Sequence, residues 1–165
     1  ARRGGTENLP GILGMGAAAE KITMPSEQWV AQTSQQARQR DALEHGLMAA
    51  LPGTVVFGAQ APRLPNTSYV RFGHVHADVV LQRLDRMGVM ASSGAACSAS
   101  GNEPSPVLIA MGVPRDEAMC AVRFSLSTHN TMQQIQTVLE RLPLELAPLM
   151  AEHATPIHQP SGVFA

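Results

Sequence analysis

Short strand-like segments alternate with longer helix-like segments along this chain, and this alternation constrains the fold more than any other feature. The segments TVVFG, TSYVRFG and VRFSL are rich in β-branched and aromatic residues, and runs with helical caps or helical spacing separate them. A small sheet cannot bury a face by itself, so helices must pack on it. The pattern predicts an α/β or α+β fold, in which helices cover a small sheet.

Prolines and glycines give the expected boundaries of these elements. Pro25 and Pro52 end two helices, and Gly88 stops a third. The second helix carries apolar residues of uneven period, and the last carries a broad apolar face over 132–149. The expected elements are helices over 10–21 and 26–50, strands over 54–58 and 67–73, a helix over 77–88, a strand over 89–92, short helices over 104–112 and 114–120, a strand over 122–126 and a helix from about 130.

Composition excludes several classes of protein. Of the 165 residues 44% are apolar and 15% are charged, which is typical of one globular core and not of a disordered tail or a coiled coil. The formal net charge is -1 without a basic cluster, so we expect no nucleic-acid partner. No apolar run reaches the roughly 18 residues of a membrane span, and no signal peptide is recognisable, so we expect a cytoplasmic protein. Because the chain opens on a Gly-rich turn and not on Met, we expect a fragment.

Two cysteines occur, and their contexts differ. They lack the spacing of a zinc site or a disulfide framework, which favours a reducing compartment. Cys97 lies in a loop of Ser, Gly and Ala, where a thiolate can be stabilised and reached. Loop composition alone fits a small buried cysteine equally well. Cys120 directly precedes an apolar strand and is interpreted as a core residue.

Three separated motifs resemble one known family in the correct order. They are RRGGTENLPGILGMGAAAE over 2–20, SSGAACSASGNEPSPVLIAMGV over 92–113 and AVRFSLSTHNT over 121–131, with a weaker match in APRLPNTSYVRF over 61–72. The chain thereby resembles the C-terminal portion of NifS/IscS-like (group I) cysteine desulfurases of the class V aminotransferase family. The resemblance implies the C-terminal domain of a fold-type I transferase that depends on pyridoxal 5'-phosphate (PLP).

The resemblance also implies roles for three residues. Cys97 matches the catalytic cysteine that takes the sulfur of L-cysteine as a persulfide and releases L-alanine. Arg123 matches the arginine that binds the substrate carboxylate, although a structural salt bridge is the alternative. Thr6 matches the threonine that contacts the PLP phosphate across a homodimer, and a helix cap is its alternative. The persulfide sulfur would pass to an iron-sulfur scaffold or another acceptor protein.

The sequence lacks the lysine that such an enzyme needs. The sole lysine, Lys21, has none of the expected context, so we interpret it as a surface residue and place the cofactor lysine outside this chain. On this view residues 1–24 end a large PLP domain and 25–165 form a small domain, and the isolated chain is inactive. Two alternatives are a PLP-free sulfur-carrier or interaction module and a selenocysteine lyase.

One polar cluster receives no role. His74, His76 and Asp78 lie close together in the sequence, but a solvated turn explains them better than a metal site. We therefore expect no metal ligands in this chain.

Overall fold

The computed structural model describes residues 5–23, 26–93 and 103–153, which form six helices and four strands within those ranges. The helices and strands agree closely with those expected from the sequence. The elements are α1 (Leu9–Thr23), α2 (Glu27–Ala50), β1 (Thr54–Val56), β2 (Thr67–Phe72), α3 (Ala77–Arg86), β3 (Ser92–Ser93), α4 (Pro106–Ala110), α5 (Arg115–Met119), β4 (Ala121–Ser125) and α6 (Met132–His153).

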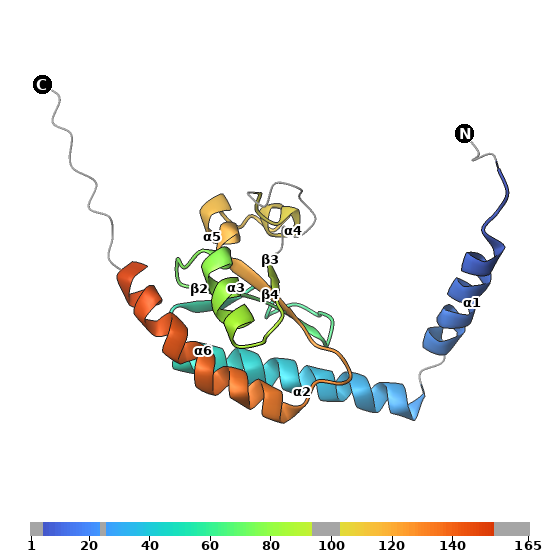
Figure 1. The fold of residues 1–165 in the computed structure, drawn as a ribbon, viewed down its shortest axis with the longest axis horizontal. Helices are drawn as coiled ribbons and strands as arrows, with labels where there is room; N and C mark the ends of the chain where they lie inside the picture. The colour runs from blue at the N-terminus through green and yellow to red at the C-terminus, as the bar shows by residue number, and fades with distance from the viewer. Residues whose placement is uncertain (1–4, 24–25, 94–102, 154–165) are drawn as a thin grey trace, which may run out of the picture.

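The strands form one antiparallel sheet in the order β1-β2-β4-β3. In Figure 1 the sheet lies between the paired helices α2 and α6 on one side and the short helices α4 and α5 on the other. Successive side chains of β2 and β4 point to opposite faces of the sheet. Val70, Phe72, Val122 and Phe124 point into the main core, which α2, α3 and α6 cover.

The buried residues of α2 form a regular stripe along the side of the helix that faces the core. The apolar residues of the helix by themselves show no clear period. Gln36, Gln39, Leu43, Glu44 and Leu47 are all buried, at the spacing of one helix face. Polar side chains therefore supply three of the five buried members of the stripe. These buried polar residues explain the uneven apolar period in the sequence, because a pattern of hydrophobic residues leaves them out.

The interface between α2 and α6 depends on one small residue. A Cβ at Gly46 would lie 2.6 Å from both terminal methyl carbons of Leu139, so any larger residue requires the Leu139 side chain to move. Helix α6 continues through Pro143 and Pro148, which lie inside the helix expected from the sequence, although proline is unusual in a helix interior. The apolar face predicted for this helix does enter the core through Ile135, Val138, Leu142 and Leu146.

Helix α1 makes little contact with the sheet and its covering helices. It stands apart in Figure 1, and every side chain described from residue 5 to 21 is exposed. Leu9, Ile12, Leu13 and Met15 are 55–75% exposed, which is unusual for apolar residues on a helix. No helix among the described residues is long and apolar enough to cross a membrane.

Candidate functional site

Arg123 lies on the face of the sheet that the main core leaves free. In β4 its neighbours Val122 and Phe124 are buried on the core face, whereas Arg123 points the other way and is exposed. Its guanidinium makes no ion pair or hydrogen bond to the part of the chain that the structure describes. It therefore presents an unneutralised fork of donors, which suits an incoming carboxylate.

Strands on both sides hold Arg123 in place. It pairs with Tyr69 of β2 and with Ser92 of β3, so it is central in a row of three residues on one face. Strand β3 runs from Ser92 to Ser93 and then leads directly into the segment that contains Cys97. Residues 94–102 lie outside the described residues, so the position of Cys97 stays a prediction.

A second arginine on the same face is already neutralised. The Arg71 guanidinium donates to the carbonyl oxygen of Gly73 at 2.8 Å and pairs with the carboxylate of Glu117 at 3.1 Å. Its side chain is 13% exposed. Glu117 neutralises the charge of Arg71, and the carbonyl oxygen of Gly73 accepts from its guanidinium. Arg71 therefore makes the kind of structural salt bridge that was the alternative role for Arg123.

A small apolar cluster covers the end of this face. Leu108 of α4 and Ala118 of α5 pack on Ala121, with Tyr69 and Phe57 against them. The rings of Tyr69 and Phe57 meet edge to face, with centroids 6.0 Å apart. The hydroxyl group of Tyr69 is buried and has no hydrogen-bond partner within the part of the chain that the structure describes. This packing fixes the residue directly beside Arg123.

Thr6 is not the cap of α1. The side chain of Asn8 accepts a hydrogen bond from the backbone N–H of Gly11 at 3.2 Å, which is the capping contact. Thr6 is exposed two residues earlier. The alternative role of Thr6 as a helix cap is therefore wrong, and its contact with a phosphate stays a prediction.

Cys120 is a core residue, as predicted. It is 7% exposed, and its thiol donates to the carbonyl oxygen of Asp116 at 3.3 Å. Burial raises the pKa of the Cys120 thiol, although the nearby charge of Arg71 partly opposes this. A buried thiol that resists ionisation is a poor nucleophile.

Of the remaining candidates, His76 caps a helix, whereas His74 and Lys21 are exposed. His76 caps α3, because its Nδ1 atom accepts from the backbone N–H of Asp78 at 3.4 Å. His74 is exposed, and the described residues include no group of three potential metal ligands. Lys21 is exposed on α1, as expected from the sequence.

Sequence reasoning missed Tyr69 and Arg71. Both alternate with the buried residues Ser68, Val70 and Phe72 along β2, so their common face could have been read from the strand pattern. The pairing of β2 with β4 could not, because these strands are far apart in the chain and no turn joins them.

Comparisons with known proteins agree with this architecture. The profile of the family described as aminotransferase class-V matches residues 1–138. A curated cysteine desulfurase from Enterobacter agglomerans is 40% identical over 144 residues, which are 86% of this chain and 34% of that protein. Cysteine desulfurase NifS from Azotobacter vinelandii is 38% identical over 148 residues, which are 90% of this chain and 36% of that protein.

A solved structure has the same fold. The NifS-like protein from Rickettsia africae superimposes with a TM-score of 0.70 and 28% sequence identity, over 88% of this chain and 36% of that one. The chain thus spans about a third of the length of the relatives that it matches. Because the family profile covers most of the chain, this protein belongs to the aminotransferase class-V family.

Proposed function

We propose that this chain is part of a cysteine desulfurase in which Arg123 binds the carboxylate of L-cysteine and Cys97 accepts the sulfur. The observation that carries the proposal is the guanidinium of Arg123, which has no partner among the described residues and is exposed beside the strand that leads to Cys97. The curated relatives named above are cysteine desulfurases, which supports the same choice of substrate. The activity is proposed for a longer protein that contains this chain.

Arg123 would bind and orient the substrate. A planar guanidinium donates two parallel hydrogen bonds to a carboxylate, which sets the direction of the bound amino acid. The antiparallel partners on both sides hold the backbone of Arg123, so that little ordering of the main chain is needed on binding. Tyr69 and its packed neighbours form one side of the surface on which the substrate would lie.

Cys97 would carry the sulfur transfer. Its thiolate attacks the sulfur atom of L-cysteine, a sulfur–sulfur bond forms, and the carbon–sulfur bond of the substrate breaks. L-cysteine and the Cys97 thiol become L-alanine and a Cys97 persulfide, so no external oxidant is consumed. The buried thiol of Cys120 is unsuited to this step.

The described residues do not by themselves form a PLP site. Lys21, the only lysine, lies on α1, while Arg123 lies on the sheet. PLP would supply the electron sink that weakens the carbon–sulfur bond. We propose that residues outside this chain hold PLP, and that Thr6, with its side chain exposed, contributes only a contact to the phosphate, in a homodimer.

The domain division follows from the same proposal. Residues 1–24 would belong to a large PLP domain and 25–165 to a small domain that carries the cysteine. The exposure of the apolar residues of α1 supports this division, because another part of a longer protein would bury them. The sulfur acceptor would be an iron-sulfur scaffold or another acceptor protein.

The test uses a full-length protein that contains this chain, with L-cysteine as substrate and L-alanine as the measured product. We expect Arg123→Ala to raise KM about 10- to 100-fold, because a charge-assisted bidentate contact is lost. Cys97→Ser should abolish the persulfide, measured by mass spectrometry of the Cys97 peptide. Arg83→Ala, on α3 of the core face, is the control and should leave KM unchanged.

Three outcomes would overturn the assignments. Arg123→Ala with an unchanged KM would remove the proposed carboxylate contact. Cys97→Ser with an unchanged rate of alanine and sulfide release would remove Cys97 as the acceptor. Loss of PLP absorbance in Lys21→Ala would contradict the surface role of Lys21.

A further inference from the structure

The position of Arg123 depends on a strand register that no tight turn sets. Strands β2 and β4 are distant in sequence: the paired residues Arg71 and Ala121 are 50 positions apart. In both strands buried residues alternate with residues of the opposite face. A slip of two residues would keep every side chain on its own face, so the hydrophobic pattern alone excludes only odd slips.

Polar side chains of α2 bind the chain directly after β4. Gln36 donates from Nε2 to the carbonyl oxygen of Leu126 at 3.2 Å. Gln39 donates from Nε2 to the carbonyl oxygen of Asn130 at 2.6 Å and is only 2% exposed. These two contacts join residues about 90 positions apart and fix where the end of β4 lies on α2.

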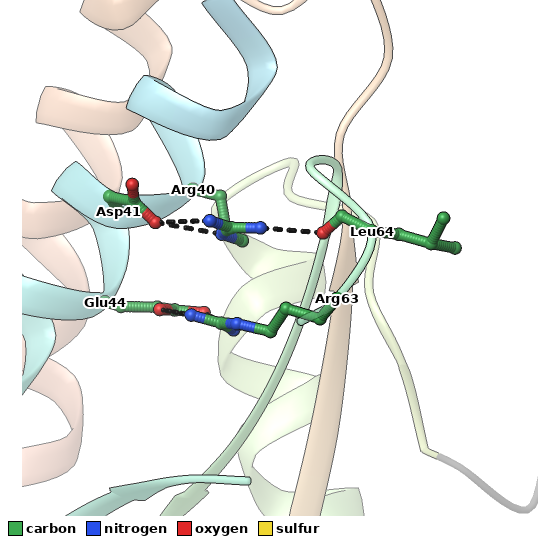
Figure 2. Close-up of polar contacts among 5 residues, drawn as sticks. All are labelled: Arg40, Asp41, Glu44, Arg63 and Leu64. Carbon is green, nitrogen blue, oxygen red and sulfur yellow. Dashed lines mark hydrogen bonds and ion pairs between the residues drawn. The ribbon is translucent and has the colours of Figure 1, made fainter. Parts of the chain in front are cut away.

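The next polar residues of α2 bind the chain directly before β2. Arg40 donates from Nη1 to the carbonyl oxygen of Leu64 at 2.7 Å. The two terminal guanidinium nitrogens of Arg63, Nη1 and Nη2, each donate to one carboxylate oxygen of Glu44 at 2.6 Å. Figure 2 shows these contacts one above the other on the same side of α2, with the side chain of Leu64 pointing away from the helix.

One helix therefore holds both strands at the same end of their pairing. The backbone N–H of Leu126 donates to the carbonyl oxygen of Asn66 at 2.7 Å, in the rung next to the Thr67 and Ser125 pair. Glu44 is 4% exposed, and hydrogen bonding to Glu44 raises the pKa of Arg63. A slipped register would leave buried donors and a buried carboxylate without partners, which is costly.

We propose that Gln36, Gln39, Arg40 and Glu44, the polar row of α2, set the register of β2 against β4 and thereby position Arg123. Gln36 and Gln39 hold the end of β4, while Arg40 and Glu44 hold the start of β2. The polar row has a positioning role, and its importance for substrate binding rests on the proposed function of Arg123.

Pairs of engineered cysteines read the register directly in the full-length protein. Thr67 and Ser125 form a non-hydrogen-bonded rung, since the neighbouring rung carries the Leu126 to Asn66 hydrogen bond. Cα atoms are about 4.5 Å apart in such rungs, which permits a disulfide. Thr67→Cys with Ser125→Cys reports the native register. Thr67→Cys with Ser127→Cys or with Arg123→Cys reports the two slips by two residues.

The row variant replaces Gln39, Glu44 and Arg63 together with leucine, which removes polar contacts without leaving an unpaired charge. Relative to the parent, we expect the ratio of the slipped to the native cross-link to rise at least about fivefold, because even one lost buried hydrogen bond is worth roughly that factor. Peptide mapping identifies each disulfide, in a background with Cys97→Ser and Cys120→Ser.

Matched variants distinguish a change of strand register from a general loss of stability. Arg83 and Glu145 form a more exposed ion pair between α3 and α6, with an N–O distance of 3.5 Å, and replacing both with leucine should leave the cross-link pattern unchanged. An unchanged pattern in the row variant would overturn the proposal. If the row variant does not fold, Gln39→Met decides in the same assay: a rise in a slipped cross-link supports the proposal, and the parent pattern contradicts it.

The row variant with Cys97 and Cys120 intact, and without the engineered cysteine pairs, gives a second readout. A shifted register should raise its KM for L-cysteine, as we expect for Arg123→Ala. If Arg123→Ala leaves KM unchanged while the cross-links shift, the register proposal stands and the carboxylate role of Arg123 fails. The two proposals are therefore tested separately.

Discussion

The two faces of the sheet use the same strands for opposite purposes. The core face buries Val70, Phe72 and Val122 completely beneath α2, α3 and α6. The opposite face presents Arg123 to solvent, and among the described residues α4 and α5 cover one end of it. Because successive side chains of a strand point to opposite faces, β4 packs Val122 and Phe124 into the core and exposes the charged side chain of Arg123 on the other face. Stability and the proposed substrate contact should therefore respond almost independently to mutation.

The largest loss of stability is expected on the core face. Phe72→Ala should lower the free energy of unfolding by about 3–5 kcal/mol, because a fully buried aromatic ring is lost and a cavity remains. Chemical denaturation checks this value. A loss below about 1 kcal/mol would mean that the core face collapses around the deletion.

A smaller loss is expected where the helices that cover the core face meet. In Gly46→Ala the new methyl group would overlap the side chain of Leu139, and overpacking of this kind costs about 1–3 kcal/mol. Gly14→Ala on α1 is the matched control, since a Cβ there meets nothing within 4 Å. The control should be neutral or stabilising in thermal unfolding, because alanine favours helix. Equal losses at both positions would contradict the close approach at Gly46.

A weaker effect is expected for the ion pair on the opposite face. Glu117→Gln should lower the free energy of unfolding by about 0.5–1 kcal/mol, because the pair with Arg71 is partly exposed and screened by solvent. The effect should shrink further in 1 M salt. A loss above about 2 kcal/mol would place this pair among the buried contacts of the core face.

The smallest effect on stability is expected at Arg123 itself. Arg123→Ala should change the free energy of unfolding by no more than about 0.5 kcal/mol, because the side chain is exposed and unpaired within the described residues. The measurement is the denaturation midpoint, beside the KM test described above. A clear destabilisation would identify Arg123 as a structural residue and remove the contrast between the faces.

Much of this architecture could be predicted locally. Ser26 begins α2 by accepting from the backbone N–H of Trp29, and Gly88, at a φ of 74°, follows α3 as its position implied. Strand β3 begins later than expected, at Ser92, because pairing with β4 and not β-branched composition defines it. The motifs around Cys97, Arg123 and Thr6 also indicated the family that the comparisons show.

By itself the sequence determined the order of helices and strands, the family and the candidate residues, because caps, alternation and motifs act over a few neighbouring positions. Only the tertiary structure decided that Arg71 is neutralised by Glu117 while Arg123 has no partner among the described residues, since both are arginines on strands of similar pattern. It also revealed that three of the five buried residues of α2 are polar. Partners of these residues lie up to 91 positions away, and such distances are set by packing and not by local spacing.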